Sequence, residues 1–116
     1  MFPNPANPGS TPPPERSARL FAALGDETRL RLVSRLSEEG PLSVTALTSG
    51  FDVTRQAITK HLHVMEEAGL VRGMRQGRES VWQLSPTGLE DARRFLELMS
   101  ERWDHALERL RVFVEE

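Results

Sequence analysis

The sequence contains no cysteine among its 116 residues, which excludes disulfides, thiolate metal sites and thiol redox sensing. It also contains no apolar run that approaches the roughly 18 residues of a membrane-spanning helix. Its first residues lack the basic, apolar and cleavable pattern of a secretion signal. We therefore expect a cytoplasmic protein that does not bind membranes.

Net charge is low as well, at -2, which at first argues against a nucleic-acid partner. The charges are unevenly distributed, however. Residues 53–78 carry five basic and two acidic side chains, a net +3, whereas residues 89–116 carry five basic and eight acidic ones, a net -3. One part of the protein is thus suited to face DNA while another part faces away.

Proline is scarce outside the first 14 residues, which hold six of the eight prolines. This composition predicts a disordered or polyproline-like tail over residues 1–14, to which we assign no function. The rest of the chain is long enough for one domain with one modest core. No nucleophile, base and orienting group recur at a recognisable spacing, and no glycine-rich phosphate loop follows a predicted strand. We therefore expect neither an enzyme nor a bound cofactor.

Start and stop signals divide the remaining chain into short elements. Side-chain oxygens that accept from first-turn amides make good helix N-caps, and they precede four of the five predicted helices at Asp26, Ser43, Thr54 and Thr87. The predicted helices are 16–24, 27–38, a short one after residue 43, 54–69 and 87–114. The second helix is expected to point Leu30, Leu32, Val33 and Leu36 inward.

The stretch from Thr54 to Gly69 predicts one helix with two chemically different faces. Ile58, Leu62 and Met65 recur at i, i+4 and i+7, the spacing of a helix that packs on a core. Polar and basic side chains occupy its exposed start and its other face: Thr54, Arg55, Gln56, Thr59, Lys60 and His63. His61 lies about 200° around the helix from His63, which excludes joint metal chelation, and is expected to pack or bond at the domain's edge.

These polar side chains are the types that read the DNA major groove. Arg and Lys reach guanine O6 and N7, Gln pairs at two points with adenine, and Thr contacts a phosphate or a thymine methyl. For an isolated helix, a solvated face is the commoner explanation. The preceding short helix and its tight turn change this balance, because two such helices form a helix-turn-helix.

The segment after Gly69 predicts an antiparallel hairpin. Residues 71–75 and 78–84 are rich in strand formers, and Gly77 tolerates the positive φ that a tight turn requires. Its tip presents Arg75, Gln76 and Arg78, which are suited to clamp phosphates or to reach into the minor groove as a wing. An ordinary charged turn is the alternative. The predicted fold is mainly α with a β-hairpin wing: a three-helix winged helix-turn-helix over residues 15–86.

The C-terminal dimerisation segment, residues 87–116, contains the last predicted helix and carries an apolar seam with alternating steps of three and four residues over more than three heptads. A helix this long extends beyond a small domain, so we expect it to form a homodimer with the same helix of a second chain. The expected dimer-interface residues are Leu20, Leu89, Ala92, Leu96, Met99, Trp103, Ala106, Leu110 and Phe113. Packing along its own domain is the alternative, because Phe95 and Leu107 broaden the stripe.

Four motifs together carry a family resemblance. They are residues 24–30 (Leu-Gly-Asp-Glu-Thr-Arg-Leu), 58–62 (Ile-Thr-Lys-His-Leu), 67–71 (Glu-Ala-Gly-Leu-Val) and 75–78 (Arg-Gln-Gly-Arg). With these motifs the chain closely resembles the arsenic-repressor (ArsR) family of bacterial winged-helix regulators over about residues 16–84. The resemblance implies a homodimer joined by its terminal helices that binds a roughly palindromic operator and usually represses transcription.

The chain departs from the metal-sensing members of that family. Those members carry Cys-Val-Cys on the helix before the recognition helix, where this chain has Ser-Val-Thr at residues 43–45. Hydroxyls are poor ligands for soft metals such as arsenite. Other members hold a metal with His and Asp ligands on the last helix, where this chain has a single histidine, His105. Glu101, His105 and Glu108 share a face by spacing, which we interpret as an exposed ion-pair cluster. No metal site is expected.

Two functions therefore stay open. The first is a dimeric, sequence-specific DNA-binding transcriptional regulator, expected to be a repressor, with double-stranded operator DNA as its partner and no effector identified. The second is a winged-helix module for protein assembly whose basic face docks an acidic partner. Steep salt dependence together with sequence preference distinguishes the first from the second.

Overall fold

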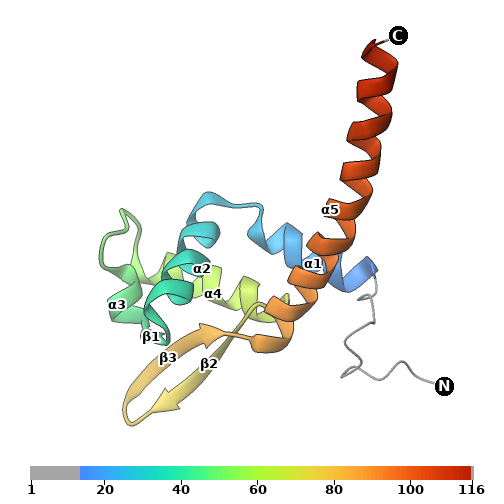
Figure 1. The fold of residues 1–116 in the computed structure, drawn as a ribbon. Helices are drawn as coiled ribbons and strands as arrows, with labels where there is room; N and C mark the ends of the chain where they lie inside the picture. Colours follow the sequence, from blue (N-terminus) through green and yellow to red (C-terminus); the bar gives the residue numbers. More distant parts are fainter. Residues whose placement is uncertain (1–13, 116) are drawn as a thin grey trace, which may run out of the picture.

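The computed structural model describes residues 14–115, so residues 1–13 of the tail predicted at residues 1–14 lie outside this range. Pro14, which we assigned to the tail, already begins a helix, as suits a residue tolerated in the first helical turn. The elements in chain order are α1 (Pro14–Leu24), α2 (Glu27–Glu39), β1 (Leu42–Ser43), α3 (Val44–Thr48), α4 (Arg55–Glu67), β2 (Val71–Gln76), β3 (Glu79–Leu84) and α5 (Pro86–Glu115). The predicted winged helix-turn-helix with a long terminal helix is confirmed (Figure 1).

The core lies between α1, α2, α3, α4 and the sheet, and α4 contributes the predicted residues. Ile58, Leu62 and Met65 are each fully buried. The prediction for α2 is wrong at Leu30, whose side chain is 52% exposed. Leu32 and Leu36 share the buried face because they are one turn apart, whereas Leu30 lies about 200° around the helix from Leu32.

The sheet has three antiparallel strands in the order β1-β3-β2, one more than the predicted hairpin. The additional strand is β1, whose residue Leu42 pairs with Trp82 and whose residue Ser43 pairs with Val81. β3 is therefore the central strand, which explains why Val81 and Trp82 are buried. Since β1 leads directly into α3, this pairing attaches the first helix of the helix-turn-helix to the wing.

The turn of the wing lies one residue later than predicted. Gln76 still pairs with Glu79, so the two turn residues are Gly77 and Arg78. Gly77 has a φ of +62°, and no other residue type among residues 14–115 has a positive φ. A two-residue turn with positive φ only at its first position is a type II′ turn, which requires glycine there.

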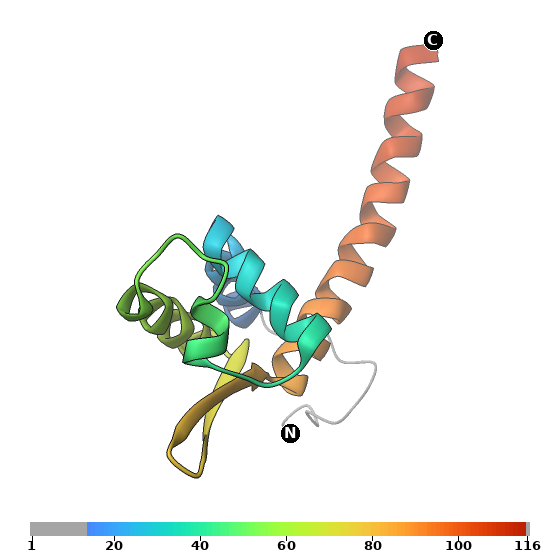
Figure 2. The ribbon, with the colours of Figure 1, turned by 90° about the vertical axis from the view of Figure 1, so that its left-hand side faces the viewer.

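The long helix α5 begins at a different cap from the one predicted. Ser85, not Thr87, accepts from the amide of Gly88 through its side chain at 3.4 Å and from the amide of Leu89 through its carbonyl at 3.0 Å. Pro86 then occupies the first helical position, where its fixed φ suits the helix. With 30 residues the helix is about 45 Å long. Its first part lies beside α1, and the rest extends beyond the domain (Figures 1 and 2).

The start of α5 approaches the end of α4 very closely. A Cβ atom placed on Gly88 would lie 2.0 Å from the carbonyl oxygen of Gly69, so only glycine fits there. The amide of Ser85 also donates to the carbonyl of Leu70 at 2.8 Å. These contacts join the connection after α4 to the first turn of α5.

Candidate nucleic-acid interface

The amino end of α4 presents the predicted polar face. Thr54 caps the helix, because its hydroxyl accepts from the amide of Ala57 at 3.0 Å. Arg55, Gln56 and Lys60 are exposed, on the sides of the helix away from its buried residues. Thr59 is half-buried and donates to the carbonyl of Arg55 at 3.0 Å. The buried side of α4 thus holds the helix on the core, and the polar side chains on its opposite side are accessible to a ligand.

Arg35 holds the helix-turn-helix in shape. Its Nη1 donates to the carbonyl oxygens of Ala46, Leu47 and Ser49 at 3.1, 3.0 and 2.9 Å. Its Nε donates to Glu39 at 2.9 Å, and this hydrogen bond holds the pKa of Glu39 below its ordinary value. α3 has only five residues, so its last carbonyls have no partner within the helix. Sequence reasoning missed this residue, although Glu39 at i+4 was a visible signal.

Asp26, Arg29 and His61 connect α2 to α1 and α4. The Asp26 carboxylate accepts from the backbone amide of Arg29 at 3.0 Å, and this bond is the main reason why the pKa of Asp26 is lowered. The guanidinium of Arg29 donates through Nε to the carbonyl of Ala23, and its Nη1 lies 3.3 Å from Nδ1 of His61. Because arginine only donates, Nδ1 of His61 is the acceptor. The prediction that His61 bonds at the domain's edge is confirmed.

His63 and Trp82 bring α4 and the wing together. The two rings meet edge to face, with centroids 5.4 Å apart and planes at 86°. Nδ1 of His63 also lies 3.3 Å from Oε1 of Glu66. His63, expected to approach DNA, therefore already has two protein neighbours. Trp82 was not predicted as part of the site, and its position becomes visible only through the pairing of β1, β3 and β2.

The tip of the wing carries the three predicted side chains. Arg75, Gln76 and Arg78 are all exposed, on the end of β2 and in the turn. Arg55, Lys60, Arg75 and Arg78 have no ion-pair partner among residues 14–115. A polyanion can neutralise them without breaking an existing pair.

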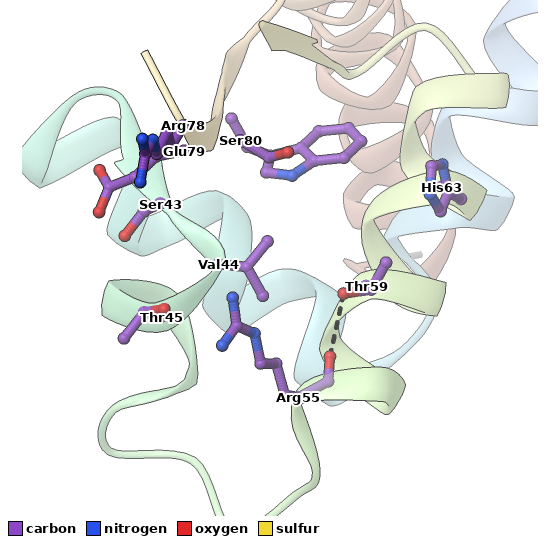
Figure 3. A pocket seen from close by; sticks show the side chains of 10 residues that line it. Ser43, Val44, Thr45, Arg55, Thr59, His63, Arg78, Glu79 and Ser80 are labelled. Atoms are coloured by element: carbon purple, nitrogen blue, oxygen red, sulfur yellow. Dashed lines mark hydrogen bonds between the residues drawn. The ribbon is translucent and has the colours of Figure 1, made fainter. Parts of the chain in front are cut away.

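A pocket of about 430 Å³ lies between the polar face of α4, the amino end of α3 and the wing (Figure 3). Arg55, Thr59 and His63 line it from α4, at successive turns of the helix. Arg78 and Ser80 line it from the wing. The structure thus brings side chains from α4 and from the wing, which are 15 to 25 residues apart in the sequence, to one concave surface.

Large apolar side chains are exposed along the length of α5. Trp103 is 57% exposed and Phe113 is 78% exposed, and Leu96 and Leu110 are exposed as well. Leu89 is also exposed, whereas Met99 and Ala106 are half-buried. These residues leave a seam that residues 14–115 do not cover.

One side of the first half of α5 packs on its own domain. The alternative that this helix packs along its own domain therefore holds for that part of the helix, whereas the part beyond the domain is free to pair with a second chain. Ala92 packs against the core, and the rings of Phe21 and Phe95 lie 5.3 Å apart. The expectation that Leu20 contributes to the dimer interface is wrong, because Leu20 is 1% exposed in the single chain. α1 turns this face to the other helices of its own domain.

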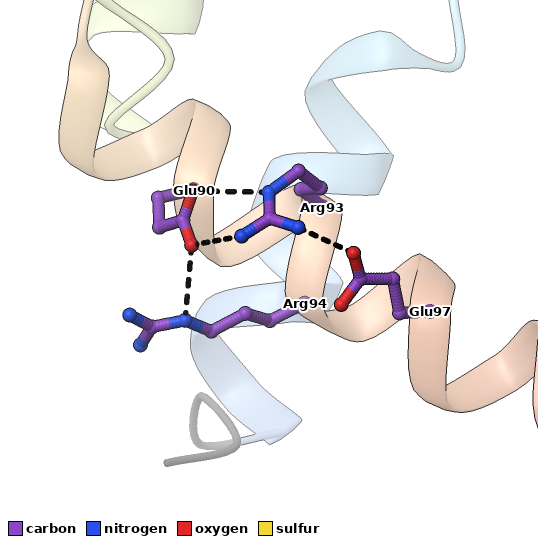
Figure 4. A network of polar contacts seen from close by, with 4 residues as sticks. All are labelled: Glu90, Arg93, Arg94 and Glu97. Carbon is purple, nitrogen blue, oxygen red and sulfur yellow. Dashed lines mark hydrogen bonds and ion pairs between the residues drawn. The ribbon is translucent and has the colours of Figure 1, made fainter. Parts of the chain in front are cut away.

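Ion pairs cover the other side of α5. Arg93 binds Glu90 and Glu97, and Arg94 lies 3.3 Å from Glu90 (Figure 4). The hydrogen bonds from Arg93 lower the pKa of Glu90, and those to Glu90 raise the pKa of Arg93. These exposed pairs add little stability individually, but they mark a charged face that is distinct from the apolar seam.

Within the part of the chain that the structure describes, no three His, Asp or Glu side chains lie close enough together to hold a metal ion. Of the expected cluster of Glu101, His105 and Glu108, one member forms an ion pair among residues 14–115: Glu108 lies 3.2 Å from Arg111. None of the described helices is long and apolar enough to cross a membrane.

Comparison with known proteins connects this geometry to a family. A family model described as a helix-turn-helix domain matches residues 24–73. The HTH-type transcriptional regulator Rv2034 of Mycobacterium tuberculosis is 40% identical over 89 residues, which cover 77% of this chain and 79% of the regulator. A solved ArsR-like transcriptional regulator from Rhodococcus sp. RHA1 is 33% identical, with a TM-score of 0.68 over 85% of this chain and 92% of that one. The chain belongs to the ArsR family.

A further ArsR-family relative is the arsenical resistance operon repressor of Escherichia coli K12, which is 41% identical over 59% of this chain and 58% of that repressor. The resemblance found in the sequence is therefore confirmed. As a member of the ArsR family, the chain is a DNA-binding transcriptional regulator and not an enzyme.

Proposed function

We propose that this ArsR-family regulator is a homodimeric repressor that binds a palindromic operator in the cytoplasm. Two surfaces carry the proposal. Arg55, Lys60, Arg75 and Arg78, which have no ion-pair partner among residues 14–115, form a cationic surface on α4 and the wing, and an apolar seam runs along α5. The first surface suits a polyanion and the second suits a second copy of the chain.

We assign the DNA contacts residue by residue. Gln56, Lys60 and Arg55 are exposed at the amino half of α4, where a recognition helix contacts base edges. Thr54, Thr59 and His63 are assigned to the flank of this contact, since each already makes a bond or ring contact within the protein. Arg75, Gln76 and Arg78 at the wing tip are assigned to phosphates or to the adjacent minor groove.

We assign the dimer contact to α5. The exposed seam comprises Leu89, Leu96, Trp103, Leu110 and Phe113, with Met99 and Ala106 at its edge and Ala92 shared with the core of the domain. Residues 15–86 would then bind DNA while residues 87–116 hold the two copies together. A two-fold dimer requires two equivalent half-sites, which makes the operator palindromic.

Binding-site selection from random duplexes, followed by a salt titration on the selected sequence, tests the proposal. We expect an inverted repeat whose half-sites lie about 34–36 Å apart or at a multiple of this distance. We also expect log affinity to fall linearly with log salt. Enrichment of no sequence, with equal binding to every duplex, would support the protein-assembly alternative instead. If a sequence is enriched, genomic footprinting would identify the promoters that the protein binds.

A further inference from the structure

The pocket between α3, α4 and the wing combines two kinds of surface. Its volume of about 430 Å³ falls in the range of small-molecule sites. Arg55 and Arg78 give it cationic groups from opposite sides, and Val44 and Trp82 give it apolar surface. Val44 is 8% exposed and Trp82 is 5% exposed, so the apolar part lies deep and the charged part lies at the rim. Figure 3 shows the Arg55 side chain directed from α4 towards Val44.

The charge of the lining favours an anion. Arg55 and Arg78 have no ion-pair partner among the described residues, whereas Glu79 supplies the acidic side chain of the lining. Two guanidinium groups against one carboxylate leave a net positive charge. Hydroxyl groups of Ser43, Thr45, Thr59 and Ser80 add further hydrogen-bonding groups around it.

The deep part of the pocket indicates which anion. A DNA backbone phosphate can occupy the space between the two arginines, but it has no apolar group to cover an indole ring. A ligand with both an apolar body and an anionic group matches the two parts of the lining.

We propose that this pocket binds a small organic anion, whose apolar body lies on Val44 and Trp82 and whose carboxylate lies between Arg55 and Arg78. The proposal rests on the DNA-binding function proposed above, because both arginines are assigned there to DNA. They cannot neutralise a ligand and a DNA strand at the same time. Binding of the anion therefore releases the operator, which makes the pocket an effector site.

The indole N–H signals of the full-length protein in a proton–nitrogen NMR spectrum test the binding step. The chain has two tryptophans, and a Trp103→Phe variant assigns the two signals. We expect phenylacetate to shift the Trp82 signal saturably while the Trp103 signal on distant α5 stays in place. The uncharged 2-phenylethanol and inorganic phosphate should not produce this shift at the same concentration. Absence of a saturable shift, or an equal shift with phosphate alone, would overturn the proposal.

A pocket-filling variant tests the link to DNA. Ser80→Phe keeps both arginines and places an aromatic side chain, which strands accept well, into the pocket. We expect it to weaken phenylacetate binding about tenfold and to leave operator affinity unchanged. Met74→Phe is the matched control, since Met74 is on the neighbouring strand and outside the lining.

Competition on a labelled operator duplex completes the test. Phenylacetate should weaken operator binding by the wild type and by Met74→Phe at the same concentration, and should require about tenfold more to do so with Ser80→Phe. Saturable binding in the NMR experiment without any change in operator affinity would overturn the effector role. A protein that binds no DNA sequence selectively would instead refute the proposed function, and the NMR experiment would still decide whether the pocket binds the anion.

Discussion

Gly73 and Trp82 lie opposite each other in the hairpin, and a Cβ atom on Gly73 would lie 3.2 Å from Cη2 of the indole. The ring occupies the space that any other residue at position 73 would fill. Trp82 in turn contacts His63 of α4. The orientation of the wing relative to the recognition helix therefore depends on position 73 being glycine, which has no side chain.

The first prediction is that Gly73→Ala destabilises the protein. The added methyl group must displace the indole, and overpacking of this kind typically costs about 1–3 kcal/mol of unfolding free energy. Urea unfolding measures it. Arg75→Ala, at an exposed position of the same strand, is the control and should change stability by less than about 0.5 kcal/mol. A Gly73→Ala protein as stable as the wild type would show that the indole moves aside freely.

Gln56→Ala should weaken binding to the selected operator by about 1–3 kcal/mol and relax the preference at one base pair. The side chain is exposed at the amino half of α4, where a two-point contact with adenine is possible. Affinities for the operator and for its single-base variants, measured by fluorescence anisotropy, test this. An equal loss on every sequence would assign Gln56 to the DNA backbone.

Arg78→Ala should weaken binding to all sequences alike. A lost phosphate contact lowers the slope of log affinity against log salt by about one unit, because one fewer counterion is released. The residue occupies the second turn position of the wing and has no ion-pair partner among residues 14–115. Titrations at several salt concentrations give the slope, and an unchanged slope would place the wing tip outside the interface.

Trp103→Asp should dissociate the dimer and nearly abolish operator binding. The indole is 57% exposed in the single chain, and burying it against a partner is worth about 3–5 kcal/mol relative to alanine. Circular dichroism should show that the domain stays folded, because its core is formed by other residues. Sedimentation gives the oligomeric state. A variant that remains dimeric at micromolar concentration would refute the assignment of the seam on α5 as the dimer contact.

Asp26→Asn should make the free energy of unfolding fall less steeply as the pH is lowered. The pKa of Asp26 is lowered in the folded protein, so its stabilising effect is present above its unfolded pKa of about 3.9 and is lost as the pH falls through its folded value. Asparagine also caps helices but does not titrate. Urea unfolding between about pH 3 and pH 6 should therefore show a steeper decline for the wild type. If the unfolding free energies of the wild type and the variant fall in parallel with pH, Asp26 does not contribute to the loss of stability in acid.

The sequence predicts best what depends on neighbouring residues. The caps Asp26, Ser43 and Thr54 and the buried stripe of α4 follow from spacings of three and four residues, and the structure has them as expected. The cap of α5 is an instructive error. Ser85 and Thr87 both carry a suitable hydroxyl, and the proline between them selects Ser85.

Features that depend on distant contacts escaped prediction. β1 has only two residues and forms only because β3, some 40 positions later, pairs with it. Without that strand, neither the central position of Trp82 nor the pocket beside it follows from the pattern. Arg35 was missed for the same reason, because its three carbonyl acceptors lie 11 to 14 residues away.

The tight contact between Gly69 and Gly88 fixes the angle between α4 and α5 in each subunit. The two backbones are in direct contact there, so the start of α5 cannot act as a hinge that moves towards α4. If α5 pairs with α5 of the second chain, the distance between the two recognition helices is fixed, and this distance sets the spacing of the half-sites that the dimer can bind. Adding or removing a few base pairs at the centre of the operator should then abolish tight binding, because neither subunit can swivel to follow its half-site.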